Sequence, residues 1–279
     1  MYPSLHAACG MNEPTSRVHF DNAPVVEMVQ ALFFAPVVGW DLLDFGLLWQ
    51  RFASNYSRHE FKPPLGEPPQ LQNQFLVAVQ KQDLGKFPVR CWFIDKSETE
   101  LAQIQDSCFI HNWRKVPSTD TYPGFDNIRL RFLRDWRLFR EFLDDRGFPG
   151  PDVWKTELTY IDQFVRGEEW STFADLPKIY RLWRGMEAEG PLSAPEYASF
   201  TVNYALSDAT TRLVFSSQPA VRPVDGKEVI QLTVTATGRP ASSTDSDVSS
   251  WFDAAHASLI EGFVNFTTPE AHAHWRRTR

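Results

Sequence analysis

Cysteine is scarce in this sequence, and neither a long apolar run nor a recognised catalytic signature occurs in it. The three cysteines, Cys9, Cys91 and Cys108, are odd in number and widely spaced, which is typical of neither a disulfide framework nor a zinc-binding knuckle. We expect Cys91 and Cys108 to be small buried hydrophobic residues. The longest apolar stretch, around 25–40, is interrupted by charged, amide, proline and glycine residues, so it falls short of the roughly 20 residues of a membrane-spanning helix.

The missing signatures exclude the enzyme classes that leave local patterns. The chain has no nucleophile elbow, phosphate-binding loop, Rossmann glycine fingerprint or His-Glu-x-x-His motif. A catalytic triad assembled from distant positions leaves no such pattern, so an enzyme remains among the alternatives. His272 and His274 form a His-x-His pair, but a third ligand at helical or hairpin spacing is missing. We therefore predict no metal and no cofactor.

Positive charge is also in short supply. The 28 Lys and Arg residues are outnumbered by 35 Asp and Glu residues, which gives a net charge of −7. Surfaces that bind nucleic acid broadly are usually basic because they neutralise phosphates, so this balance argues against such a role. The N-terminal residues lack the positively charged segment and the long apolar core of a secretory signal. We expect a cytoplasmic protein.

Apolar and aromatic side chains are abundant, at 43% and 14% of 279 residues. A chain of this length and composition buries a large core and is not disordered. Apolar residues spaced by three and four predict helices, and these are expected at 41–56, 125–146, 172–183 and 247–266. Asp41 is the expected N-cap of the first helix, and Gly147 is the expected end of the second. Asp245 or Asp247 is the expected N-cap of the last.

Alternating apolar and polar residues predict the strands. They are expected at 25–34, 74–81, 89–95, 100–112, 154–165, 197–206, 212–217 and 228–237. The chain then consists of a mobile tail at 1–18, an N-terminal half at 19–150 and a C-terminal half at 151–279. Each half has the order strand, helix, three strands, helix, so we predict a duplicated α+β fold packed as one unit. Its antiparallel sheet carries the long helices on one face.

The duplicated order is analogous to the TATA-box-binding-protein-like and helix-grip folds, an analogy that transfers no function. Several short motifs together, from Asn22 to Trp275, resemble a sporadically distributed family of bacterial and archaeal proteins without an established activity. These motifs are Ala-Pro-Val-Val-Glu at 23–27, Asn-Trp-Arg at 112–114, Tyr-Pro at 122–123 and Glu-Leu-Thr-Tyr at 157–160. The resemblance implies a common fold. Its scattered distribution is similar to that of mobile defence, toxin–antitoxin or immunity genes.

The Asn-Trp-Arg motif supplies the first candidate binding residues, Asn112, Trp113 and Arg114. Trp and Arg are enriched in interaction hot spots, and Arg114 could hold a carboxylate or phosphate through two parallel hydrogen bonds. The structural alternative places Trp113 in the core and pairs Arg114 with an internal acid such as Glu157. Glu157 could instead act as a general acid or base. Because no second carboxylate or histidine stands at a defined offset, we favour an ion pair.

The strands of the second half have an unusual polar face. Its residues are uncharged, whereas an open sheet face usually carries Lys and Glu. They are Ser199, Thr201, Asn203, Gln231, Thr233 and Thr235. Such a face could line a ligand cavity or contact another chain or a second subunit. The structural alternative is a plain solvated face, since Thr suits strands.

The predicted helix at 125–146 is the most basic stretch of the chain. It carries Arg129, Arg131, Arg134, Arg137 and Arg140. Arg134 and Arg137 fall on related faces and could contact an acidic partner or a nucleic-acid backbone. The structural alternative is a solvated face on which interleaved acids pair locally with the arginines.

Together these patterns favour a non-enzymatic binding protein. Its partner is expected to be another protein or a second copy of itself, and an accessory or immunity-type role in a mobile defence or toxin–antitoxin locus fits the resemblance. The first alternative is a small-ligand-binding or enzymatic pocket between helices and sheet, which a deep cavity with convergent polar groups would support. The second is nucleic-acid contact through the Arg-rich helix, Arg129–Arg140.

Overall fold

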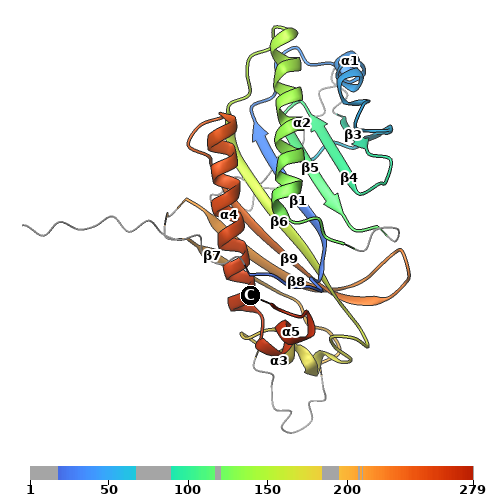
Figure 1. Cartoon of the computed structure of the whole chain (residues 1–279), viewed down its shortest axis with the longest axis vertical. Coiled ribbons are helices and arrows are strands. Elements are labelled where there is room, and N and C mark those ends of the chain that lie inside the picture. Colours follow the sequence, from blue (N-terminus) through green and yellow to red (C-terminus); the bar gives the residue numbers. More distant parts are fainter. Residues whose placement is uncertain are drawn as a thin grey trace, which may run out of the picture.

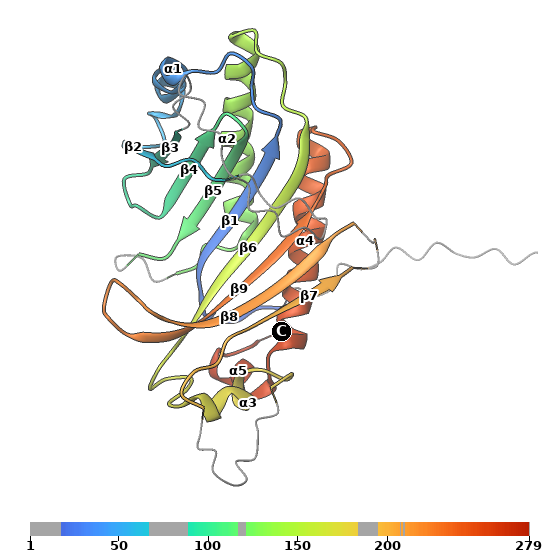
Figure 2. The same ribbon diagram turned by 180° about the vertical axis from the view of Figure 1, so that it is seen from behind.

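The computed structural model describes residues 18–66, 89–116, 121–183, 195–206, 208 and 210–278. Its centre is a nine-stranded sheet in which every pair of neighbours is antiparallel. The long helices α2 and α4 lie across one face of this sheet (Figure 1), and the strands lie in front of them when the molecule is viewed from behind (Figure 2). The predicted α+β class with an antiparallel sheet is confirmed.

The strand order places the first strands of the two halves side by side. The strands are β1 (Val25–Phe34), β2 (Arg58–Lys62), β3 (Arg90–Ile94), β4 (Glu100–Gln105), β5 (Cys108–Arg114), β6 (Val153–Val165), β7 (Phe200–Ala205), β8 (Arg212–Val221) and β9 (Glu228–Gly238). They follow the order β2-β3-β4-β5-β1-β6-β9-β8-β7. Outward from the central β1–β6 pair, the strands therefore run backwards along the chain on both sides.

The helices are α1 (Leu42–Phe52), α2 (Phe125–Asp145), the 3-10 turn η1 (Phe173–Asp175), α3 (Leu176–Ile179), α4 (Asp245–Phe266) and α5 (Pro269–His274). Among the described residues, no helix is both long and apolar enough to cross a membrane. The Asp41 carboxylate accepts from two backbone N–H groups of the first turn of α1, which confirms it as the cap. Gly147 has φ +72° just beyond α2, as expected of a C-terminal stop.

Two expectations about local structure need correction. The strand predicted at 100–112 is two strands, β4 and β5, joined by a turn at Asp106-Ser107. Both strands are buried along almost their whole length. The sequence therefore lacks the alternation of apolar and polar residues that would have marked where one strand ends and the next begins. The cap of α4 is Thr244, whose hydroxyl accepts from the Asp247 N–H, and not Asp245 or Asp247.

The sequence patterns did not predict the short elements β2 and α5, and two of the predicted segments lie outside the described residues. Strand β2 lies at the sheet edge and carries charged residues, as edge strands do; α5 has only six residues. The predicted strand at 74–81 and nearly all of the predicted tail at 1–18 lie outside the described residues. Cys91 and Cys108 are buried free thiols, as expected, and Cys9 lies outside the described residues.

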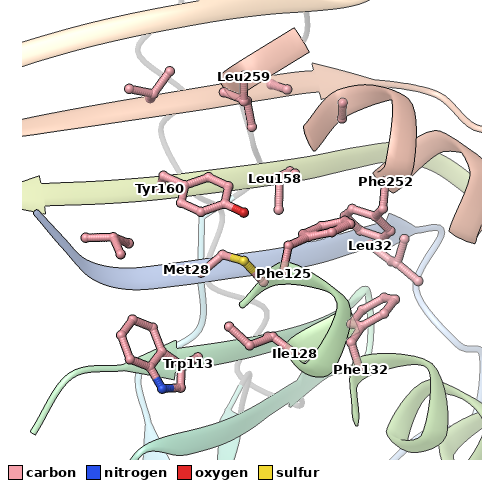
Figure 3. Packing of buried hydrophobic residues seen from close by; sticks show 14 of the residues in the cluster. Met28, Leu32, Trp113, Phe125, Ile128, Phe132, Leu158, Tyr160, Phe252 and Leu259 are labelled. Carbon is pink, nitrogen blue, oxygen red and sulfur yellow. The ribbon is translucent and has the colours of Figure 1, made fainter. Parts of the chain in front are cut away.

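The core fills the layer between the sheet and the two long helices. Alternate residues of β1 and β6 point to the helix side, where side chains from the first half of α2 and from α4 meet them (Figure 3). Examples are Met28, Leu158, Phe132, Phe252 and Leu259. Each large apolar side chain buried in this way contributes roughly 1.5–3 kcal/mol. This packing holds the start of α2 and the middle of α4 over the centre of the sheet.

Candidate ligand-binding cavity

A cavity of about 890 Å³ lies beside the start of α2. Its walls come from residues 18–25, the segment that leads into α2, the helix-facing side of β6 and the C-terminal half of α4. A volume of this size lies within the range of small-molecule sites, about 300–1,000 Å³. Helices and sheet therefore border an open-sided space large enough for a ligand.

The chain turns sharply into α2 at the cavity wall. Gly124 has φ +87° at the N-cap position, a conformation that favours glycine. Two residues before this turn, the Tyr122 ring packs edge-on against Trp113 at a centroid distance of 5.1 Å. Trp113 is buried, so it fixes the position of the Tyr122 ring.

Three polar side chains form a hydrogen-bonded chain along the wall. The Tyr122 hydroxyl lies 3.2 Å from that of Tyr160, which lies 3.0 Å from Nδ1 of His256. The His256 ring stacks on Phe125, with centroids 4.0 Å apart. At its other end the chain reaches Met28, whose sulfur lies 3.6 Å from the Tyr122 hydroxyl. Hydroxyls can turn, so this chain can donate towards either end.

Both phenols are neutral at physiological pH, and burial raises their pKa values further. The pKa of Tyr160 lies well above its ordinary value because the ring is buried, and the pKa of Tyr122 is raised for the same reason. At physiological pH each hydroxyl therefore keeps its proton. The two groups can orient a ligand by hydrogen bonds without adding charge to the cavity.

Asp162 is the exceptional residue of the cavity. It follows Tyr160 by two positions on β6, lines the cavity and is only 5% exposed. Among the described residues, its carboxyl group has no hydrogen-bond or ion-pair partner. Burial raises its pKa to about 7. Buried carboxyl groups are normally paired because desolvation of the charge is costly.

Several motifs that carried the family resemblance meet at this cavity. Ala23 and Pro24 come from the first motif, Tyr122 and Pro123 from the Tyr-Pro motif, and Tyr160 from the Glu-Leu-Thr-Tyr motif. Their positions are far apart in the sequence, and the central β1–β6 pairing brings the first and last of them together.

Sequence reasoning missed Asp162 and His256, although each left a signal. Asp162 occupies the parity of Leu158, Tyr160 and Phe164, so it is a charged residue at a core position of β6. His256 lies one helical turn after Phe252 on the buried face of α4. A polar residue in an apolar stripe is the pattern that could have identified both.

The Asn-Trp-Arg motif divides between the two faces of the sheet. Trp113 packs in the core, as the structural alternative predicts. Asn112 lies on the face away from α2, where its amide donates to Glu27 at 2.6 Å and accepts from Gln103 at 2.7 Å. The Arg114 guanidinium donates to the Glu98 carbonyl at 2.7 Å.

Glu157 is in an ion pair, as expected, but its partner is not Arg114, the partner suggested for it. Glu157 pairs with Lys155, with the nitrogen 2.7 Å from the carboxylate oxygen. In the sheet, Arg114 stands opposite Glu27 of β1, whereas Glu157 stands opposite Ala31, four residues further along the same strand. The strand register, which the sequence alone does not reveal, keeps the two side chains apart.

The neutral polar residues of the second half lie on the sheet face away from α2 and α4. Their alternate neighbours point into the core. Thr235 is 2.9 Å from the Thr159 hydroxyl, and Thr201 is 3.1 Å from the Ser216 hydroxyl. The set that shares this face is Thr201, Asn203, Gln231, Thr233 and Thr235. None of these residues lines the cavity.

The arginines of α2 make internal ion pairs. Arg129 contacts Asp253 of α4 at 3.0 Å. Both Arg137 and Arg140 contact Asp245 at the start of α4, at 3.5 and 2.5 Å. Arg134 contacts Asp135 on its own helix at 2.8 Å, and Arg131 contacts Glu100 of β4. The partners thus come largely from other elements and less from neighbouring acids on α2.

The two C-terminal histidines, His272 and His274, each contact a neighbouring polar side chain. Nε2 of His272 lies 2.8 Å from the Thr267 hydroxyl, and Nε2 of His274 lies 3.7 Å from Glu169. Within the described part of the chain, no group of three or more His, Cys, Asp or Glu side chains is placed to hold a metal ion.

Comparison of the sequence with models of protein families gave no match, and comparison with curated proteins gave none either. The residues of the cavity are therefore the basis on which a function can be assigned.

Proposed function

We propose that this protein binds a small ligand in the cavity between β6, the start of α2 and α4. The observation that carries this proposal is the buried carboxyl group of Asp162, which lacks a partner among the described residues and lines a cavity of about 890 Å³. Folding around an unpaired buried acid is unfavourable, and a ligand that bonds to it removes that cost. This favours the pocket over the protein-partner hypothesis that the sequence alone suggested.

The other polar groups support binding with a defined orientation. Tyr122, Tyr160 and His256 form a connected chain on one wall, and the remaining surface is rich in apolar and aromatic side chains. Binding sites for small molecules typically combine a mainly apolar wall with a few placed polar groups. A polar part of the ligand can thus be held at one side while its apolar part fills the rest.

The test is a fragment screen by ligand-observed NMR on wild-type protein and on a variant with a filled cavity. Ile260 of α4 lines the cavity, so Ile260→Trp should abolish binding of the fragments that the wild type binds. Ala257→Trp is the matched control because Ala257 is exposed on the same helix and is not part of the wall. Fragment binding that survives in Ile260→Trp, or a wild type that binds no fragment, would contradict the proposal.

A second proposal concerns the neutral polar face of the sheet, which is carried by Thr201, Asn203, Gln231, Thr233 and Thr235. The face extends across β7, β8, β9 and β6 and suits contact with a protein partner or a second copy. An accessory or immunity-type role in a defence locus, and membership of the sporadically distributed family, remain predictions. Light scattering with and without co-expressed neighbouring gene products tests the interaction, and a monomer that recruits none would remove it.

We infer in addition that the two halves are pseudo-equivalent products of a duplication. The mirrored strand order about the β1–β6 pair supports this, as do the positions of α2 and α4, each of which follows the last strand of its half. The same mirrored order makes the TATA-box-binding-protein-like analogy reasonable at the level of topology. The cavity is lined by residues of both halves, because the start of α2 belongs to the first half and β6 and α4 belong to the second.

A further inference from the structure

We propose that the ligand is an organic cation with an apolar body, and that its charged nitrogen pairs with the Asp162 carboxylate. This inference depends on the proposed binding function and specifies its ligand class. The structural basis is the placement of one buried acid, unpaired among the described residues, on a wall that also carries several aromatic rings.

Asp162 lies on a strand that is paired on both sides. It stands between Val25 of β1 and Leu232 of β9 in the strand pairing, so its backbone is fixed on both sides. Its side chain is 95% inaccessible to solvent, since only 5% is exposed. Because no described cation reaches it, ionisation in the empty protein is penalised by desolvation. A cationic ligand would supply the missing partner and make a charge-assisted hydrogen bond.

The other charged groups on the wall favour a cation as well. Asp21 and Asp126 also line the cavity, and Lys115 is the one lysine or arginine among its described lining residues. Asp21 lies 3.4 Å from Nε2 of His19, and Asp126 lies 3.6 Å from Arg129. Acids therefore outnumber permanent cations three to one on this wall, and a cleft lined mainly by one sign of charge favours ligands of the opposite sign.

Aromatic rings provide the surface for the apolar body. Phe20 and Phe263 line the cavity and pack edge-to-face with centroids 5.9 Å apart. Phe125 lines the cavity as well and is held by the stacked His256 ring. Aromatic faces attract cations as well as apolar groups. A flat organic ammonium ion therefore suits the wall better than a small inorganic cation.

Proton linkage gives this ligand class a distinctive signature. Burial raises the pKa of Asp162 to about 7, so the empty site is partly protonated at neutral pH. The cation binds the ionised form, and binding should therefore tighten as the pH rises. The neighbouring phenols of Tyr122 and Tyr160 stay neutral over this range. The remaining titratable groups on the wall are His19, Asp21, Lys115, Asp126 and His256.

The experiment is calorimetric titration of the full chain with three probes that share one ring and differ in head group. Tyramine carries a cation, tyrosol is neutral and 4-hydroxyphenylacetate is an anion. Tyramine should bind at least about tenfold more tightly than tyrosol, the factor expected of one charge-assisted hydrogen bond. Its affinity should rise up to about tenfold from about pH 6 to about pH 8, while that of tyrosol stays constant.

Two variants assign the effect to one carboxylate. Asp162→Asn should weaken tyramine binding at least about tenfold and leave tyrosol unchanged. Asp152→Asn, which removes an exposed acid outside the cavity, should behave as the wild type. A melting temperature of Asp162→Asn no lower than that of the wild type shows that the variant is folded.

The outcomes separate this inference from the proposed function. Equal affinity for tyramine and tyrosol, or unchanged tyramine binding in Asp162→Asn, overturns the cation assignment. No tyramine binding up to about 10 mM overturns it too. In each case the binding function still stands if other fragments bind the wild type and fail to bind Ile260→Trp.

Discussion

Two buried acids in the same core layer have opposite surroundings. Asp135 of α2 is fully buried. It accepts a hydrogen bond from the Tyr56 hydroxyl and forms an ion pair with Arg134 at 2.8 Å. Asp162 of β6 is 5% exposed and has no such partner among the described residues. The first acid connects elements of the fold, whereas the second faces a cavity.

The difference teaches how to separate a structural acid from a binding one. Burial alone does not distinguish them, because both lie between helices and sheet. The presence of partners does, since a paired acid is satisfied by the protein and an unpaired acid gains from a ligand. Removing each carboxylate should therefore have opposite effects on stability, and the following predictions test this contrast.

The largest effect is expected at Asp135. Asp135→Ala leaves the Arg134 cation and the buried Tyr56 hydroxyl without their partner, which should lower the free energy of unfolding by about 3–5 kcal/mol. Urea denaturation followed by circular dichroism measures this. Asp144→Ala, an exposed acid on the same helix, is the control and should change stability by less than about 0.5 kcal/mol. A loss below about 1 kcal/mol in Asp135→Ala would contradict the structural role.

The contrast also shows which features the sequence could reveal. Periodicity located α2 within one residue and β6 within one residue, because each has a single well-defined apolar face. It failed for the β4–β5 hairpin, where burial on both faces removes the alternation. It also failed for the Arg114–Glu157 pair, since the pairing register depends on contacts between distant strands. Tyr122 and Tyr160 were in recognised motifs, but their meeting with Asp162 required the fold.

The second prediction concerns Asp162 itself. Its folded pKa, about 7, lies above the ordinary value of 3.8, so the folded state binds more protons than the unfolded state between those values. Stability should therefore fall as the pH rises from about 4 to about 7, by at most about 4 kcal/mol. Asp162→Asn should remove this loss and be more stable than the wild type at about pH 8. Urea denaturation of both proteins at about pH 4 and about pH 8 measures the difference in the free energy of unfolding. If the variant is less stable than the wild type at about pH 8, the carboxylate has a partner.

The third prediction concerns His111, a buried histidine whose titration changes the stability with pH in the opposite direction. His111 lies 3.6 Å from Asp135 and 3.8 Å from Glu100, distances too long for hydrogen bonds, and burial lowers its pKa to about 4. The unfolded state, with an ordinary pKa of 6.5, therefore binds more protons between those values. Stability should fall by up to about 3 kcal/mol as the pH drops from about 6.5 to about 4.

The two titrations oppose each other between about pH 4 and pH 6.5, which makes the His111→Gln variant informative. Removing the histidine should leave the Asp162 effect more visible, so stability should rise more steeply on acidification than in the wild type. His272, whose pKa is also lowered to about 4, contributes in the same direction as His111. An unchanged pH profile in His111→Gln would mean that His111 does not titrate as the buried environment requires.

The smallest effect is expected where α2 meets α4 through its arginines. Arg129 is half-buried and bonds to Ser249 and Asp253 at 2.6 and 3.0 Å, so Arg129→Ala should cost about 1–2 kcal/mol. The Arg137 side chain is 63% exposed and its contact with Asp245 is 3.5 Å long, so Arg137→Ala should cost less than about 0.5 kcal/mol. Thermal unfolding at low and high salt measures both variants. Equal losses would mean that the ion pairs of α2 act through overall charge, because local burial predicts a clear difference. Equal losses would also favour the alternative in which the Arg-rich face of α2 contacts nucleic acid, because phosphates are attracted by the overall positive charge of a surface.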